Sequence, residues 1–188
     1  MRISVILTLL GPDRPGLVSA LSARATEAGA NWMESRMVQL AGQFAGVVRL
    51  EVDVDAADRL EAALRGLASE DLHLTIERGR EGSPAPLRRV QLDLVGHDHP
   101  GIVQDISAVL ARHGISIEEL ETGCEPASMS GELLFRAYAE LSVPTQIDLH
   151  AVQDDLEALA NALMVDLELH DAGARLGTAP GTADRPAG

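Results

Sequence analysis

The sequence predicts an α+β protein made of two copies of one β-α-β-β-α-β unit. An internal repeat is the first observation behind this prediction. The segment GPDRPGLV at residues 11–18 recurs as GHDHPGIV at residues 96–103, an offset of 85 positions. Holding that offset without gaps makes eleven of the 25 residues in 5–29 identical to their counterparts in 90–114. The second observation is that the same order of strand-like and helix-like patterns follows each copy.

Each module opens with a strand in which apolar residues alternate, and a helix with i, i+3, i+4 apolar spacing follows the Gly/Pro loop. Gly29 and Gly114 stand where a glycine ends a helix. Second strands are expected at residues 32–40 and 115–122. Third strands alternate apolar and polar residues at 48–55 and 135–141. A second helix and a last strand follow in each module, the strands at 72–77 and 165–170.

Each third strand has one apolar face and one polar face. This pattern indicates an antiparallel sheet with both helices on one face and solvent on the other, the ferredoxin-like arrangement. We expect a first domain at residues 1–80, a linker at 81–89 rich in Gly, Pro and Arg, and a second domain at 90–171. Residues 172–188 lack apolar periodicity and are predicted to be a disordered tail. The connection between the second and third strands is expected to be short in the first module, at about residues 41–45. In the second module it is expected to be longer, at residues 123–131.

Composition excludes several classes of function. The 188-residue chain has 29 acidic residues against 15 basic ones, all arginine, so its formal net charge is −14. Without lysine it has neither a P-loop lysine nor a Schiff-base lysine. The acidic charge and an aromatic content of 2% argue against direct nucleic-acid binding. One cysteine, Cys124, and no apolar run of about 20 residues lead us to expect a cytoplasmic protein without membrane contact.

The charge is unevenly divided between the modules. Residues 1–80 carry a net charge of −2, whereas residues 81–188 carry −12. The acidic second module is therefore either a docking surface for a protein partner or simply a solvated face.

The repeated G-x-D-x-P-G loop has a structural and a functional interpretation. Structurally, its first glycine allows a tight turn, its aspartate caps the helix and its proline fits the first helical turn. Functionally, free N–H groups at a helix start bind a carboxylate, and a nearby Asp or Asn takes an ammonium group. A small amino acid carries both groups. The pattern alone leaves the two interpretations open.

The stretches LTLLGPDRPGLVSALSARATEAGANW and LVGHDHPGIVQDISAVLARHGISI and the loop CEPASMSGELLF resemble tandem ACT domains. Within that family they are similar to the repressors of the glycine cleavage system. The resemblance implies ligand binding by the first-strand-to-helix loop and the start of the next strand, often between two ACT units. In this chain those ligand-binding positions are Gly11, Pro12, Asp13, Arg14, Pro15, Gly16, Leu17 and Asn31, and then Gly96, His97, Asp98, His99, Pro100, Gly101, Ile102 and Ser116.

The resemblance also implies a function: a regulatory protein that binds glycine or serine and acts through protein contact, as a transcriptional repressor with no DNA-binding element of its own. The alternative is an accessory subunit of an enzyme of amino-acid or one-carbon metabolism. We expect no catalysis by the chain itself, because it has no nucleophile–base pair and no cofactor fingerprint. His97 and His99 form too weak a pattern for a metal site. A homodimer is compatible with the family's sites between units.

Overall fold

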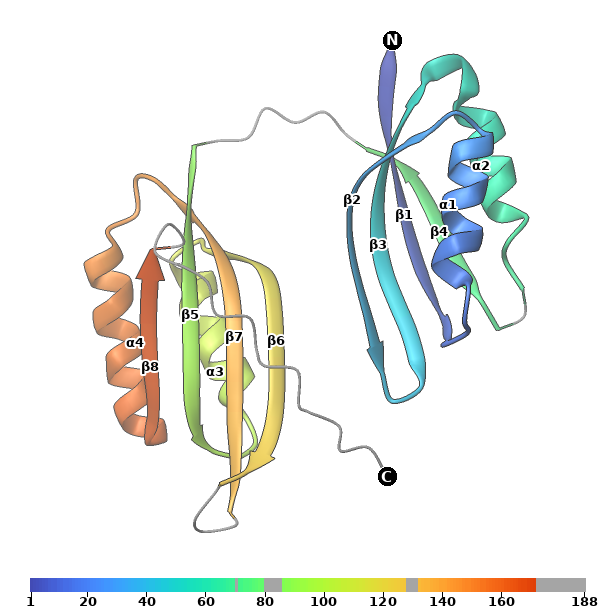
Figure 1. Ribbon diagram of the computed structural model, residues 1–188. Coiled ribbons are helices and arrows are strands. Elements are labelled where there is room, and N and C mark those ends of the chain that lie inside the picture. The colour runs from blue at the N-terminus through green and yellow to red at the C-terminus, as the bar shows by residue number, and fades with distance from the viewer. Residues whose placement is uncertain (70, 80–85, 128–131, 172–188) are drawn as a thin grey trace. The chain divides into compact units, whose positions relative to one another are not determined.

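Figure 1 shows the computed structural model, in which the chain divides into two compact units, Met1–Gly82 and Ser83–Gly188. The structure describes residues 1–69, 71–79, 86–127 and 132–171. Each unit holds a four-stranded sheet and is described here by itself. The predicted tail at residues 172–188 and most of the predicted linker lie outside the described residues.

The first unit follows the predicted element order. Its elements are β1 (Arg2–Pro12), α1 (Leu17–Glu27), β2 (Asn31–Leu40), β3 (Gln43–Asp53), a short 3-10 helix η1 (Val54–Ala56), α2 (Ala57–Arg65) and β4 (His73–Arg78). The strands lie in the order β2-β3-β1-β4, and every neighbouring pair is antiparallel.

The second unit repeats this plan. Its elements are β5 (Leu87–His97), α3 (Ile102–Arg112), β6 (Ser116–Pro126), β7 (Leu133–Pro144), α4 (Leu149–Leu163) and β8 (Val165–Asp171). The order β6-β7-β5-β8 is again antiparallel throughout. The predicted β-α-β-β-α-β pattern is confirmed in both units.

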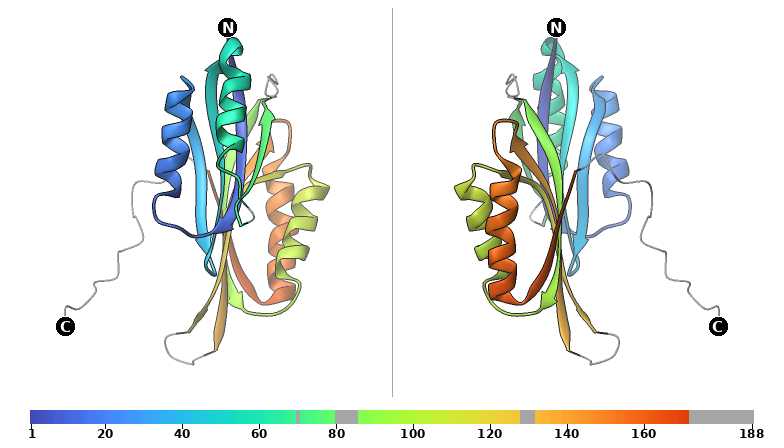
Figure 2. Two further views of the ribbon diagram at one scale, coloured as in Figure 1. Left: turned by 90° about the vertical axis from the view of Figure 1, so that its right-hand side faces the viewer. Right: turned by 90° about the vertical axis from the view of Figure 1, so that its left-hand side faces the viewer.

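Both helices of a unit cover the same face of its sheet, as the two views in Figure 2 show for each unit separately. The alternating strand residues named by the sequence form the cores, because every second side chain of a strand points to the helices. In the first unit Val5, Leu7 and Leu9 are at most 1% exposed and pack with Leu60 and Leu64 of α2. In the second unit the equivalent strand residues pack with α3 and α4. Each unit therefore has its own hydrophobic core.

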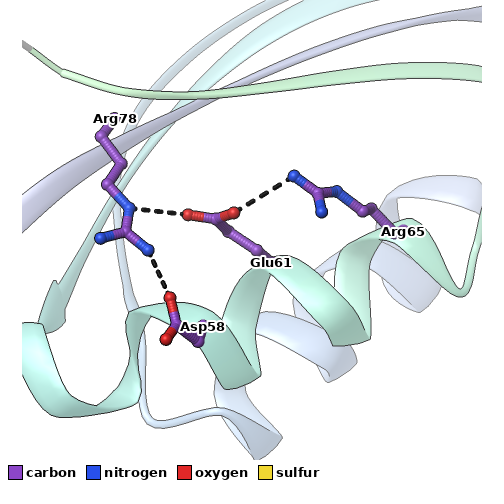
Figure 3. A network of polar contacts seen from close by, with 4 residues as sticks. All are labelled: Asp58, Glu61, Arg65 and Arg78. Atoms are coloured by element: carbon purple, nitrogen blue, oxygen red, sulfur yellow. Dashed lines mark hydrogen bonds and ion pairs between the residues drawn. The ribbon is translucent and has the colours of Figure 1, made fainter.

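A surface ion-pair network joins the last strand of the first unit to its second helix (Figure 3). The Arg78 guanidinium donates from Nε to Glu61 Oε1 at 2.8 Å and also bonds Asp58, while Arg65 donates to Glu61 Oε2 at 3.2 Å. The hydrogen bond that Arg78 donates to Glu61 is the largest cause of the raised pKa of Arg78. The network fixes the end of β4 against α2.

The connections between the second and third strands differ from their predicted form. In the first unit a two-residue turn, Ala41–Gly42, joins β2 to β3, with φ values of 49° and 79°. This left-handed pair is the turn geometry that suits a two-residue hairpin. In the second unit β6 continues to Pro126, so the loop expected at residues 123–131 begins four residues later than predicted. The residues at 128–131 lie outside the described part.

Some predicted boundaries also move. Strand β5 begins at Leu87, within the segment expected to be a linker, because residues 87–89 pair with β7. Val54, expected to continue the apolar face of the third strand, lies in η1 and is 41% exposed. Gly29 and Gly114 adopt positive φ values of 79° and 67° just after their helices, as predicted. Over the described residues, none of the helices is both long enough and apolar enough to cross a membrane.

Candidate ligand-binding loops

The first glycine of each loop motif lies in a strand and not in a turn. Gly11 is paired with Phe44 in the first sheet, and Gly96 with Phe135 in the second. The expectation that these glycines allow a tight turn is therefore wrong. What requires glycine is close approach: an added Cβ would lie 2.6 Å from the Asp71 carbonyl oxygen at Gly11 and 2.3 Å from Val165 Cγ1 at Gly96.

The turn itself falls on the last glycine of the motif. Gly16 and Gly101 have φ values of 87° and 105° and are the N-cap residues of α1 and α3, with no side-chain capping bond. The expectation that Asp13 and Asp98 cap these helices is therefore wrong. The prolines of the motif precede the N-cap glycine and so lie before the first helical turn. The left-handed conformation explains why a glycine ends the motif, since other residues pay a steric cost there.

The backbone of each loop is held to the neighbouring hairpin. The N–H of Asp13 donates to the Gly42 carbonyl at 3.0 Å, and the N–H of Asp98 donates to the Leu133 carbonyl at 3.2 Å. These bonds anchor the start of each loop. The helix that follows presents its first-turn N–H groups at the loop's end, except that the Leu17 N–H of α1 already donates to the Arg14 carbonyl at 3.3 Å. The Asp13 and Asp98 side chains are exposed and belong to residues three positions before the N-cap glycine of the helix. A helix start of this kind can hold a small anion.

The basic side chains of the loops already have partners. Arg14 Nη2 lies 2.7 Å from Asp71 Oδ2, a bond between exposed groups that ties the first loop to the segment before β4. His97 Nδ1 lies 3.6 Å from Glu132 Oε2, and His99 Nδ1 lies 3.2 Å from the Pro100 carbonyl oxygen. Within the ranges that the structure describes, no three His, Cys, Asp or Glu side chains are grouped to hold a metal ion.

Asp98 also faces the cysteine of β6. Loss of solvation raises the pKa of the Cys124 thiol, and the Asp98 carboxylate raises it further through charge repulsion with the thiolate and a hydrogen bond with the thiol. Sequence reasoning gave no sign of this contact, because the two residues are 26 positions apart. It follows from β6 being longer than predicted, which brings Cys124 level with Phe135 at the loop end of the sheet.

The structure does not bring Asn31 to the first loop within one unit. Through the pairing of β2 with β3 and of β3 with β1, Asn31 lies level with Ser4 of β1. The loop begins at the other end of β1, beyond Gly11. Seven strand positions separate the two levels, roughly 23 Å at the usual rise of a strand. The side chain of Asn31 donates instead to Met33 Sδ at 3.2 Å.

Ser116 lies at the matching far end of the second sheet. It is opposite Ser142, which pairs with Arg89, while Gly96 lies seven positions further along β5. The loop residues of each motif are therefore adjacent in space, and the strand-start residues Asn31 and Ser116 are not part of the same cluster.

Sequence reasoning missed a hollow on the second sheet. It has a volume of about 480 Å³ and is lined by residues of all four strands, four of them acidic, on the face away from the helices. Alternating acids in β6 and β8, in the segments EELETGCE and DLELHD, are the sequence signal that could have indicated it.

Comparison with known proteins supplies the family. A family model described as the ACT domain matches residues 4–77, and a second ACT-domain model matches residues 90–161. The chain belongs to the ACT-domain family. Its two ACT domains stand in tandem and correspond to the two units of the structure, so the resemblance inferred from the repeated motif is confirmed.

Relatives of the tandem ACT protein align with most of its length. The glycine cleavage system transcriptional repressor of Escherichia coli K12 is 26% identical over 163 residues, covering 85% of each chain, and that of Shigella flexneri gives the same values. The crystal structure of an unknown protein from Galdieria sulphuraria is 30% identical, with a TM-score of 0.81 over 92% of this chain and 99% of its own.

The crystal structure of a candidate glycine cleavage system transcriptional repressor has a TM-score of 0.67 at 21% identity, covering 90% of this chain and 97% of its own, which supports the shared fold. The protein is thus a regulatory ACT-domain protein homologous to the glycine cleavage system transcriptional repressor.

Proposed function

We propose that this tandem ACT protein binds a small amino acid, glycine or serine, at its strand-to-helix loops and thereby changes its contact with a protein partner. In this proposal it represses transcription through that partner and needs no DNA-binding element of its own. The observation that carries the proposal is the same in both units. The helix after each loop starts at a left-handed glycine without a side-chain cap, at Gly16 and Gly101.

The chemistry of the loop fits a zwitterion. A helix start without a capping side chain leaves N–H groups to bind a carboxylate, and the dipole of the helix favours a negative charge there. Asp13 and Asp98 are exposed beside these N–H groups and offer a carboxylate to the ammonium group. A small side chain is favoured because the loop is short and is held to the β2–β3 or β6–β7 hairpin.

Asn31 enters this proposal only through the loop of another ACT unit. Because Asn31 lies at the far end of its own sheet, it reaches a loop-bound ligand only if another ACT unit supplies the loop. A homodimer that pairs the loop of one copy with the β2 start of the other would join both features in one site. The same reasoning applies to Ser116, whose shorter side chain reaches less far.

The proposal further assigns the protein to the cytoplasm, without catalysis or a cofactor of its own. Its homologues from Escherichia coli and Shigella flexneri are repressors, and ACT domains are regulatory modules. The ligand-binding loops are the expected input, and the surface that meets the partner is the output. Net charge supports action through protein contact, since a chain at −14 does not favour nucleic acid.

A thermal-shift panel of the twenty amino acids tests the proposal. A ligand that binds only the folded protein stabilises it by RT ln(1 + [L]/Kd), about 1.4 kcal/mol at ten times Kd, which is a shift of several degrees for a small domain. We expect glycine or serine to give this shift and the larger amino acids to give none. Calorimetry on the responding amino acid then gives the stoichiometry.

Matched variants locate the binding. Asp13→Asn with Asp98→Asn removes both loop carboxylates, and we expect it to abolish the shift. Asp55→Asn with Asp154→Asn makes the same change of charge at exposed positions outside the loops and should leave the shift intact. No response to any of the twenty amino acids, or an equal response in both double variants, would overturn the proposal.

A further inference from the structure

The hollow on the second sheet gathers negative charge on one face. Its lining includes four carboxylates, those of Asp93, Glu121, Asp166 and Glu168, together with Tyr138 and Arg136. These side chains project from the sheet face opposite α3 and α4, since the intervening residues of β5 and β7 enter the core and those of β8 pack against it. Glu121 of β6 shares this face because it lies opposite Tyr138. We call this set of six residues the acidic groove.

Strand register explains why the acids gather. Asp93 lies opposite Tyr138 on one side and Glu168 on the other, and Tyr138 lies opposite Glu121. One row across all four strands therefore reads Glu121, Tyr138, Asp93, Glu168. The next row adds Arg136, Val95 and Asp166. The phenol ring of Tyr138 is thus the only aromatic group of the groove and is flanked by carboxylates on both sides.

The positive groups near the groove do not balance its charge. Arg136 is bonded to Glu125, which is outside the groove. The imidazole of His170 lies 3.2 Å from Glu168 and 3.8 Å from Asp93. For Glu121 and Asp166, the described part of the chain places no basic nitrogen within 4.0 Å. The groove therefore presents a net negative charge to solvent.

The first unit shows that the fold does not require these acids. The repeat and the two registers align each groove position with a residue of the first sheet. Glu121, Tyr138, Asp93 and Glu168 correspond to Arg36, Val47, Thr8 and Thr75, and Arg136 and Asp166 correspond to Ala45 and His73. None of the four carboxylates has an acidic counterpart. The same sheet is built without them.

The acids also carry a cost for the free protein. Asp93 and Glu168 are direct cross-strand neighbours, and like charges placed opposite each other destabilise a sheet. A row with three carboxylates around one aromatic ring would be relieved by a cation bound from outside. The ring face of a tyrosine attracts a guanidinium or ammonium group in addition.

We propose that the acidic groove docks a cationic segment of a protein partner, with an Arg or Lys side chain over Tyr138 and its charge between Asp93, Glu121 and Glu168. Charge complementarity favours this partner, because four carboxylates spread over the sheet match a peptide chain with several positive groups. A hollow of about 480 Å³ accommodates a few side chains of such a segment. The inference rests on the proposed function in taking protein contact as the output of the regulator.

The chain offers a reporter inside the groove. Tyr138 is the only tyrosine of the sequence, so 3-fluorotyrosine labelling of the full chain gives one ¹⁹F signal at this position. An arginine hexapeptide is the probe. We expect saturable displacement of the Tyr138 signal, with affinity that falls as salt is raised. An uncharged hexapeptide of glycine and serine should leave the signal unmoved.

Two triple variants with the same change of net charge separate the groove from the general acidity of the unit. The groove variant is Asp93→Asn, Glu121→Gln and Glu168→Gln. The control variant is Asp105→Asn, Asp154→Asn and Glu157→Gln, three exposed acids of α3 and α4. We expect the groove variant to weaken hexapeptide binding about tenfold and the control less than about twofold.

A Tyr138→Val variant, which places the residue of the first unit at this position, should also weaken peptide binding when followed by calorimetry. Equal losses in the two triple variants, or a Tyr138 signal that does not respond to the peptide, would overturn the proposal. Amino-acid binding is measured separately on the same proteins and should be unchanged. Failure of the groove is therefore distinguishable from failure of the ligand-binding loops.

Discussion

Replacing Gly96 by alanine tests the account of why the loop motif begins with glycine. Gly96 lies in β5 opposite Val165, the first residue of β8. An alanine Cβ at this position would lie 2.3 Å from Val165 Cγ1, 2.7 Å from its Cβ and 3.0 Å from its Cα. Carbon atoms in contact are normally about 3.5–4.0 Å apart. The two strands must therefore separate locally or Val165 must leave its buried position.

The expected cost follows from overpacking. Forcing an extra methyl group into a packed site costs about 1–3 kcal/mol, and here the backbone of β8 is among the atoms that clash. We expect Gly96→Ala to lower the free energy of unfolding by about 2–3 kcal/mol. Gly123 of β6 is the matched control, because its added Cβ would meet nothing within 4 Å. Gly123→Ala should be neutral or stabilise by up to about 1 kcal/mol, since it removes backbone freedom from the unfolded chain.

Urea unfolding followed by the ¹⁹F signal of fluorotyrosine at Tyr138 reports on the second unit alone. Combining Gly96→Ala with Val165→Ala removes the nearest clash but leaves the Cβ contact at 2.7 Å. The double variant should therefore recover part of the loss, with a coupling free energy of about 1 kcal/mol. Equal stability of Gly96→Ala and Gly123→Ala would refute the close-approach explanation.

Two further variants probe the turn and the second loop. Ala41→Asn should stabilise the first unit by about 0.5–1 kcal/mol, because Ala41 has a φ of 49° and asparagine adopts this conformation at lower cost. Thermal unfolding measures the effect, and an unchanged or lower midpoint would contradict this explanation. Asp98→Asn should speed alkylation of Cys124 by iodoacetamide a few-fold at pH 7.5. The thiolate is the reacting form, and removing the Asp98 carboxylate lowers the pKa of the Cys124 thiol. A slower reaction would contradict the contact between Asp98 and Cys124.

The sequence predicts most of the fold because the fold depends on periodicity. Residues that alternate along one strand, such as Leu7 and Leu9, must share a face of their sheet. Because the sequence is repeated, Leu92 and Leu94 pack in the same way in the second unit. The glycines after the first helices were also recognisable, since a helix end favours a left-handed residue there. Strand ends were less predictable. Leu87 belongs to β5 because it pairs with Pro144, far along the chain, and Pro126 belongs to β6 because it pairs with Leu133.

The candidate site was predictable only in part. The motif identified the loops, but it did not say which glycine makes the turn, because a glycine required by a close neighbour looks the same in sequence as one required by a positive φ. Gly11 is of the first kind and Gly16 of the second. Asn31 was joined to the loop by resemblance, and only the register shows that it lies at the other end of the sheet. The acidic groove depends on pairing across four strands, which no single segment reveals.

A titration with glycine and with serine, followed by the backbone amide signals of protein labelled with ¹⁵N-glycine, tests the central claim most directly. The labelled residues include Gly16 and Gly101 at the helix starts, and Gly66 and Gly123 at positions outside the loops serve as internal controls. We predict saturable shifts of Gly16, Gly101 or both, with the control signals unchanged. Absence of any shift at millimolar amino acid, or shifts confined to glycines outside the loops, would contradict the assignment of the loops as the ligand-binding site.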